Sequence, residues 1–285
     1  MIVGAFGLRD SFSYVAARAA FKGITPVSVA NTSDIFRDLQ RGRLDAAVVP
    51  LENTSGGWIE DVLFELMSLS SKDPRFQVIK EVDLPVVLCV AGKNALAKAK
   101  RVYSHPYPLV HSRHWLGQRL PKAERIATTS TSEAALRAAS DPEAVALCNV
   151  TAAKKAGLKI LVNEVPSQSL NMTRFVVVSR GGRGAAPAKL RNKSCLWFAA
   201  PNQPGALVHN LQVFEKHGVN ITRISSRSMD AFKSYRFFLE IDGDLRAKKM
   251  QPLVLDLKKS SDEMVIIGSY PILHVSKSIL NSLEK

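Results

Sequence analysis

The stretch DAAVVPLENTSGGWIEDVLFELMSL, residues 45–69, joins an apolar run to a polar turn and then to a helical pattern. Residues 46–49 carry no charge and predict a buried strand. Residues 57–69 place their apolar side chains as one face of an amphipathic helix does. A strand followed by a helix is the repeating unit of a mostly parallel α/β sheet. Ligands of such sheets bind beyond the carboxyl ends of the strands, where the polar residues 52–55 lie.

The same strand–helix alternation runs through most of the chain. In the first part, strands are expected at 2–6 and 27–30, and helices at 11–21 and 33–42, with Ser33 as a candidate N-cap. A second alternating series fills residues 101–158. Long extended segments at 76–92 and 159–178 separate the two series, so we expect two lobes joined by two crossings, with a cleft between them. The predicted lobes are about 1–83 with 159–180, and about 84–158.

The last third of the chain has a different order of elements. Residues 181–192 are rich in Gly, Ala and Arg and predict a linker. Residues 193–285 read strand, helix, strand, strand, helix, strand, which is the ferredoxin-like arrangement. We therefore expect a separate C-terminal domain over 193–285.

Composition narrows the class of protein. The formal net charge of +14 favours an anionic partner, such as a dicarboxylate or a phosphate. The Lys and Arg residues are scattered and aromatic residues make up only 7%, which disfavours nucleic acid as a partner. Charges at Arg9 and Asp10 come too early for a signal peptide, and no apolar run is long enough to span a membrane, so a cytoplasmic protein is expected. Cys89, Cys148 and Cys195 lie in apolar runs and are expected to be reduced core residues.

A second polar stretch precedes the apolar run Phe175–Val178. Asn171, Thr173 and Arg174 put an amide, a hydroxyl and a guanidinium at the mouth of a buried strand. Such a strand end is either a capped turn or one wall of a site. The Arg174 side chain either forks onto a carboxylate of a ligand or points away from the face of Thr173, because neighbours in a strand alternate.

Four stretches give the chain a resemblance to the prephenate dehydratase family with a C-terminal ACT regulatory domain. They are FGLRDSFSYVAA, VVPLENTSGGWIEDVLFEL, VYSHPYPLVHSRHWL and NMTRFVVV, and the last matches the Thr-Arg-Phe motif of the family. PGALVHNLQVFEKHGVNITRI is similar to the Gly-Ala-Leu half of the ACT effector motif. The resemblance implies an α/β fold, with a two-lobed, periplasmic-binding-protein-like dehydratase domain followed by a ferredoxin-like ACT domain.

The resemblance also implies a reaction and a set of site residues. Prephenate would lose carbon dioxide and its ring hydroxyl to give phenylpyruvate in phenylalanine biosynthesis. No cofactor is expected, because aromatisation of the ring supplies the driving force. Thr173 would donate to the departing hydroxyl, Asn53 would donate to a carboxylate or the leaving oxygen, Glu52 would act as a proton reservoir, and Ser104 would face them across the cleft. The expected substrate-binding residues are Ser11, Thr54, Ser55, His111, Ser132 and Arg174, with Thr54 and Ser55 offering amides at a helix start.

The same resemblance implies phenylalanine as an effector and an assembly of two or four chains through the ACT domain. The expected effector-binding residues are Gly205, Ala206, Leu207, Asn220 and Arg227. Ser225 and Ser228 replace a glutamate and a proline of the family motif, so weakened feedback is expected. Two other functions stay open: an arogenate dehydratase, and a catalytically silent small-molecule sensor, which the departures at Leu8, Asp10 and His111 favour.

Overall fold

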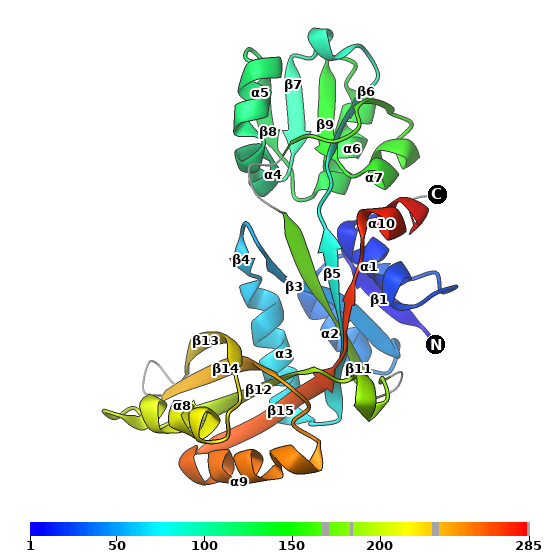
Figure 1. Ribbon diagram of the computed structural model, residues 1–285. Helices are drawn as coiled ribbons and strands as arrows, with labels where there is room; N and C mark the ends of the chain where they lie inside the picture. The colour runs from blue at the N-terminus through cyan, green and yellow to red at the C-terminus, as the bar shows by residue number, and fades with distance from the viewer. Residues whose placement is uncertain (167–170, 183–184, 230–233, 284–285) are drawn as a thin grey trace.

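The computed structural model describes residues 1–166, 171–182, 185–229 and 234–283. Two lobes and a C-terminal unit follow one another along the length of the molecule, and the long strands β5 and β11 run up its middle (Figure 1). The strands form an 11-stranded sheet and a 5-stranded sheet. The predicted α/β class with two lobes is therefore observed.

The first lobe is built on the strand–helix units expected from the sequence. β1 (Val3–Phe6) pairs in parallel with β2 (Val27–Val29) and with β3 (Ala46–Asn53). The long strands β5 (Phe76–Pro85) and β11 (Met172–Arg180) add antiparallel neighbours, so the sheet is mixed. The helices of this lobe are α1 (Phe12–Ala20), α2 (Thr32–Gln40) and α3 (Glu60–Lys72). α2 and α3 cover one face of the sheet, and α1 covers the other.

Two helix starts differ from the prediction. The cap of α2 is Asn31, whose side chain accepts from the amide of Asp34, and not Ser33. α3 begins at Glu60, because Gly57–Trp58 forms a short strand, β4, that pairs back onto β3. Thr54 and Ser55 are therefore hairpin residues and do not offer amides at a helix start.

The second lobe carries the 5-stranded sheet, in the order β10-β6-β9-β7-β8. Its strands are β6 (Cys89–Gly92), β7 (Arg101–Ser104), β8 (Glu124–Ala127), β9 (Ala144–Cys148) and β10 (Lys159–Val162). Its helices are α4 (Pro106–His111), α5 (Arg113–Arg119), α6 (Thr131–Ser140), α7 (Val150–Lys155) and the 3₁₀ turn Leu96–Lys98. β10 belongs to this lobe because it pairs with β6, whereas the sequence placed residues from 159 onward in the first lobe.

The C-terminal unit has the predicted βαββαβ order. Its elements are β12 (Lys193–Ala200), α8 (Ala206–Lys216), β13 (Ile221–Met229), β14 (Ser234–Asp242), α9 (Gln251–Ser260) and β15 (Glu263–Tyr270), with 3₁₀ turns at Ala188–Leu190 and Lys248–Met250. The strands lie in the order β13-β14-β12-β15, and β15 meets β5 of the first lobe where Gly268 pairs with Val78. The chain then returns along the first lobe as β16 (Ile272–His274), parallel to β5, and as α10 (Lys277–Leu283), beside α1 (Figure 1).

The hydrophobic core joins the first lobe to the C-terminal unit. One cluster contains Val176 of β11 together with Trp197, Phe238 and Ile267 of the C-terminal strands. Trp197 is fully buried, and its indole donates to Ser70 Oγ of α3 at 3.3 Å. The three cysteines are buried free thiols, as expected. None of the helices described is long and apolar enough to cross a membrane.

Candidate active site

Thr173 and Asn53 meet at the mouth of two adjacent strands. They are direct partners in the β3–β11 pairing, and Asn53 Nδ2 donates to Thr173 Oγ1 at 2.8 Å. Thr173 is only 8% exposed. Since its oxygen accepts the amide proton, the hydroxyl hydrogen of Thr173 is available for another acceptor.

Further hydrogen bonds lock the two strand ends together. Asn53 Nδ2 also lies 3.0 Å from Asn171 Oδ1, and Asn53 Oδ1 accepts from the amides of Ser55 and Gly56. The amide of Thr54 donates to the carbonyl of Met172 at 2.9 Å, and Thr54 Oγ1 accepts from the Met172 amide at 3.0 Å. The polar stretches 52–55 and 171–174 therefore form one structure although they are far apart in the sequence.

Two of the expected binding residues present buried hydroxyls without a partner among the described atoms. These are Ser55 in the hairpin and Ser132 in the first turn of α6, which Ser130 caps. An unpaired buried hydroxyl costs free energy that a bound acceptor recovers. Tyr107 of the second lobe reaches the same hairpin, because a Cβ on Gly56 would lie 3.1 Å from its ring.

Other expected residues are used in local structure. Ser104 is fully buried, and its hydroxyl donates to the carbonyl of Leu147 at 2.6 Å. Ser11 caps α1 by accepting from the Tyr14 amide. His111 is the half-buried last residue of α4. The hydroxyls of Ser104 and Ser11 are thus bonded to nearby backbone groups and not to the hydroxyl of Thr173.

Arg174 and Glu52 point to the opposite face from Thr173 and Asn53. Arg174 Nη1 donates to Glu52 Oε2 at 2.6 Å, and the guanidinium also contacts Glu81 of β5 and Glu240 of β14. Of the two orientations open for Arg174, the structure has the one directed away from Thr173. Both oxygens of Glu52 are in ion pairs, the second one with Arg223, so the carboxylate is directed to the C-terminal unit.

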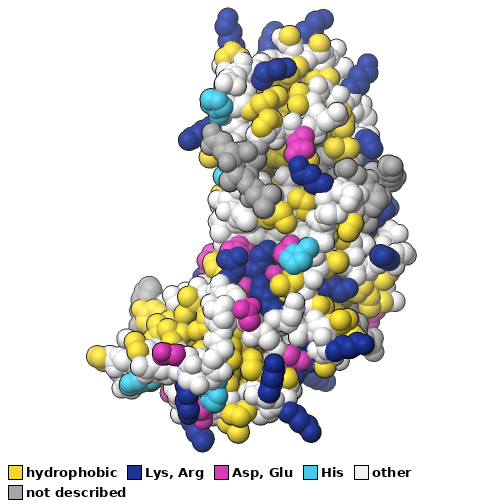
Figure 2. All heavy atoms as spheres, in the orientation of Figure 1, with side chains coloured by type: hydrophobic (Ala, Val, Ile, Leu, Met, Phe, Trp, Pro, Cys, Tyr) yellow, Lys and Arg dark blue, Asp and Glu magenta, His cyan; other side chains and the backbone are white. Residues whose placement is uncertain are grey.

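Three cations and three carboxylates share this cluster, which we call the junction cluster: Glu52, Glu81, Arg174, Lys193, Arg223 and Glu240. Burial alone would raise the pKa of Glu81, but Arg174 and Lys193 outweigh it, and the pKa lies below its ordinary value. Burial opposes the charge of Arg174, yet Glu81 and Glu240 raise the pKa of its guanidinium. Figure 2 shows basic and acidic side chains gathered where the C-terminal unit meets the first lobe.

Sequence reasoning missed Glu81, Lys193, Glu240 and Tyr107. A partial signal was present for the two glutamates, because each lies among apolar residues of an expected strand, although both strands carry other charged residues as well. Such residues are rarely buried unless paired. Their partners come from strands distant in the sequence, so the pattern alone cannot name them.

The expected effector residues lie at two places in the C-terminal unit. Gly205 caps α8 with a left-handed backbone (φ 84°), which favours glycine, and Ala206 and Leu207 follow it. Asn220 donates to Asp242 Oδ2 at 2.9 Å, beside β13. Arg227 is paired with Glu60 of the first lobe at 2.5 Å.

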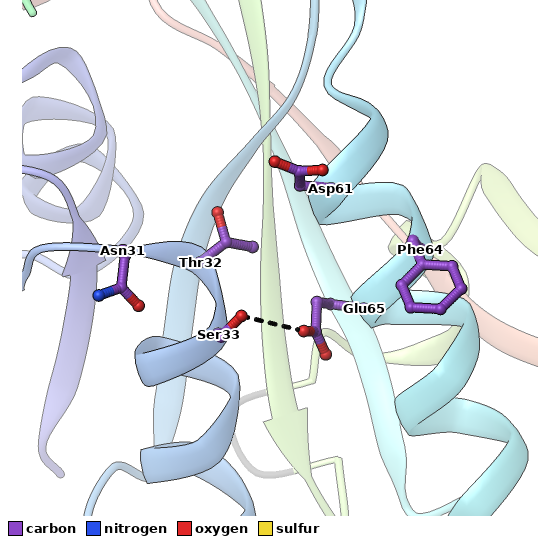
Figure 3. Close-up of a pocket in the computed structure, with 6 residues that line it drawn as sticks. All are labelled: Asn31, Thr32, Ser33, Asp61, Phe64 and Glu65. Carbon is purple, nitrogen blue, oxygen red and sulfur yellow. Dashed lines mark hydrogen bonds between the residues drawn. The ribbon is translucent and has the colours of Figure 1, made fainter. Parts of the chain in front are cut away.

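A separate cavity of about 280 Å³ lies between α2 and α3 (Figure 3). Asp61 and Glu65 line it, and Ser33 donates to Glu65 there. Two carboxylates disfavour a dianionic ligand, so this cavity is a poor candidate for the substrate site. No cluster of three His, Cys, Asp or Glu side chains suited to a metal occurs within the described ranges.

Comparison with known proteins identifies the family. The model of the prephenate dehydratase family matches residues 3–183. The bifunctional chorismate mutase/prephenate dehydratase of Aquifex aeolicus is 30% identical over 274 residues, covering 94% of this chain and 73% of the relative. The Escherichia coli (strain K12) protein of the same name is 32% identical, covering 93% and 69%. The chain belongs to the prephenate dehydratase family.

Two solved structures share the fold. A prephenate dehydratase from Arthrobacter aurescens in complex with L-Phe aligns with a TM-score of 0.85 at 24% identity, covering 95% of this chain and 90% of that one. GqqA, described as a novel type of quorum quenching acylase, aligns with a TM-score of 0.84 at 26% identity, covering 95% and 97%. One fold thus carries two described activities, so the site has to decide between them.

Proposed function

We propose that the chain is a prephenate dehydratase that converts prephenate to phenylpyruvate, carbon dioxide and water in phenylalanine biosynthesis. Membership of the family supports this proposal, and so does the bond from Asn53 to Thr173. In the reaction the ring carboxylate leaves as carbon dioxide, its electron pair aromatises the ring, and the ring hydroxyl departs with one proton as water. The hydroxyl of Thr173, with its oxygen occupied by Asn53, has its hydrogen free for that departing oxygen.

The proposed binding residues suit the two carboxylates of prephenate. The unpaired hydroxyls of Ser55 and Ser132 are donors that a carboxylate would satisfy. Tyr107 lies over Gly56 and narrows access of water to the hairpin. Glu52 supports the site from the opposite face through its ion pairs, which replaces the expected role of proton reservoir.

An acylase is the second candidate, because of the structural match to GqqA. A threonine nucleophile needs an adjacent base that takes its proton. The partner of Thr173 Oγ1 is the side-chain amide nitrogen of Asn53. This nitrogen donates a hydrogen bond to the hydroxyl oxygen and cannot take the proton of Thr173. This bond favours dehydration with Thr173 as a hydrogen-bond donor.

The C-terminal unit is proposed to be an ACT domain that spans about 193–270 after a linker at 181–192, and not the expected 193–285, because β16 and α10 pack on the first lobe. Its βαββαβ order supports the proposal, and the Arthrobacter aurescens protein of the same fold was solved with L-Phe. Phenylalanine would bind near Gly205 and Asn220 in an assembly of two or four chains. Because Ser225 and Ser228 replace motif residues and Arg227 is engaged by Glu60, feedback is expected to be weak. Tight calorimetric binding of phenylalanine would contradict weak feedback.

Turnover of the purified chain tests the proposed function. Prephenate and arogenate are offered separately, and an acyl-homoserine lactone is offered as an acylase substrate. Phenylpyruvate formation from prephenate is expected. Product from arogenate alone would reassign the substrate. Hydrolysis of the amide bond of the acyl-homoserine lactone alone, which releases the fatty acid, would favour the acylase. No product from any of them would favour the sensor.

A further inference from the structure

The hairpin that carries Asn53 is held by the C-terminal unit at both of its ends. At its start, Arg223 Nη1 of β13 donates to Glu52 Oε1 at 2.7 Å. At its end, where α3 begins, Arg227 Nη2 lies 3.0 Å from the Glu60 carbonyl and 2.5 Å from Glu60 Oε2. Two arginines of one strand therefore bind the segment 52–60, one before Asn53 and one after it.

The geometry of β13 allows both arginines to reach this segment. Arg223 and Arg227 are four residues apart on one strand, so their side chains leave the same face of the sheet. Between the two contacts, Trp58 packs edge-on against Phe238 of β14, with ring centroids 5.5 Å apart. Trp58 is also the cross-strand partner of Glu52, so all three contacts act on one hairpin.

The same contacts extend to the second strand of the site. Glu52 Oε2 binds Arg174, the neighbour of Thr173, and Arg174 binds Glu240 of β14. The C-terminal unit thus fixes the backbone of both Asn53 and Thr173 from the face opposite to the site. A shift of β13 would change the distance between these two side chains, which is 2.8 Å here.

We infer that Arg223 and Arg227 are positioning residues for the reaction: they hold the Asn53 hairpin in register with Thr173. This inference rests on the proposed function and adds to it a role for residues outside the matched family region, 3–183. It also gives Arg227 a role other than effector binding. A misplacement of about 1 Å in a catalytic constellation can cost about a hundredfold in rate.

The two arginines are suited to a test because they are only partly buried. Their side chains are 39% and 32% exposed, against 9% for Arg174, and Glu52 keeps its ion pair with Arg174 when Arg223 is replaced, so their loss costs less than the loss of Arg174. Arg223→Gln, Arg227→Gln and the double variant are therefore expected to fold. Arg236→Gln is the matched control, because Arg236 pairs with Glu263 inside the C-terminal unit and is 22% exposed.

The kinetic readout is kcat and KM for prephenate. The double variant is expected to lose kcat by about tenfold to a hundredfold, with a smaller change in KM, while Arg236→Gln keeps wild-type values. The exchanged pair Glu60→Arg with Arg227→Glu is expected to recover part of the loss of Arg227→Glu alone. Wild-type kcat in the double variant, with an active wild-type enzyme, would overturn the inference.

A second readout does not depend on activity. Hydrogen exchange of the hairpin amides, including those of Ser55, Gly56 and Ile59, is expected to speed up in the double variant and not in Arg236→Gln. Unchanged exchange would overturn the inference even if the wild-type chain proved inactive on prephenate. Inactivity of the wild type with faster exchange in the variant would refute the proposed function and leave the positioning intact.

Discussion

Removing the guanidinium of Arg174 is the most severe single change to the junction cluster. Arg174 contacts three carboxylates, those of Glu52, Glu81 and Glu240, and its side chain is 9% exposed. Arg174→Met keeps an unbranched chain but leaves the cluster with three carboxylates against two cations. The excess negative charge is buried, because Glu81 and Glu240 are 2% and 0% exposed.

The magnitude follows from this burial. Breaking a buried ion pair by removing one partner costs about 3–5 kcal/mol, since the remaining charge stays desolvated. With a urea dependence of about 2.5 kcal/mol per molar, a loss of 4 kcal/mol lowers the midpoint by roughly 1.6 M. Glu81→Gln in the Arg174→Met background removes one excess charge, so the two losses are expected to be less than additive by about 0.5–3 kcal/mol.

Urea unfolding followed by tryptophan fluorescence measures these quantities. Trp197 reports on the C-terminal unit and Trp58 on the hairpin, so both sides of the junction contribute to the signal. A loss of unfolding free energy below about 1 kcal/mol for Arg174→Met would contradict this expectation. It would mean that the cluster is solvated in solution and behaves as a surface ion pair.

Two further predictions concern stability. Gly268→Ala places a Cβ 2.2 Å from the carbonyl oxygen of Val78, so it is expected to destabilise the chain by about 1–3 kcal/mol or more. Gly117→Ala in α5 places its Cβ at an ordinary contact distance, 3.9 Å from Arg125 Nη2, and is expected to be neutral or stabilising. Thermal melts of both variants check this, and equal melting temperatures would contradict it. The pKa of Glu81 in the folded chain lies below its ordinary value of 4.5. The ionised carboxylate therefore stabilises the folded chain above about pH 4.5, and this contribution is lost as the pH falls through the lower folded-state pKa. The urea midpoints of the wild type and of Glu81→Gln, measured at a series of pH values, are therefore expected to converge below about pH 4.5. A difference between the midpoints that grows below this pH would show that the pKa of Glu81 is not lowered in the folded chain.

Local patterns predicted the elements well where one sequence window contained the whole signal. The apolar run 46–49 and the run Phe175–Val178 are buried strands, and the last third has the expected βαββαβ order. The polar ends of these two strands, β3 and β11, meet at Asn53 and Thr173, the residues that the two motifs had singled out. Each of these features depends on periodicity or on the end of a strand, which a single sequence displays.

Features that depend on distant partners could not be read in this way. Nothing near Glu81 or Glu240 in the sequence names Arg174 or Lys193 as the partner that compensates the buried charge. The return of the chain as β16 and α10 onto the first lobe also needs tertiary contacts that short windows do not encode. The orientation of Arg174 was open for the same reason, since alternation gives two faces and only packing shows which one carries the site.

The turnover number of Thr173 variants at saturating prephenate tests whether the hydroxyl of Thr173 takes part in the reaction. Thr173→Ala removes the hydroxyl that Asn53 orients, and Thr173→Ser keeps it. We expect Thr173→Ala to lower kcat by two or more orders of magnitude, roughly the loss that removal of one oriented donor causes. Thr173→Ser is expected to lose much less, and both variants are expected to keep the wild-type urea midpoint. Near wild-type kcat in folded Thr173→Ala would contradict this expectation and remove Thr173 from the mechanism.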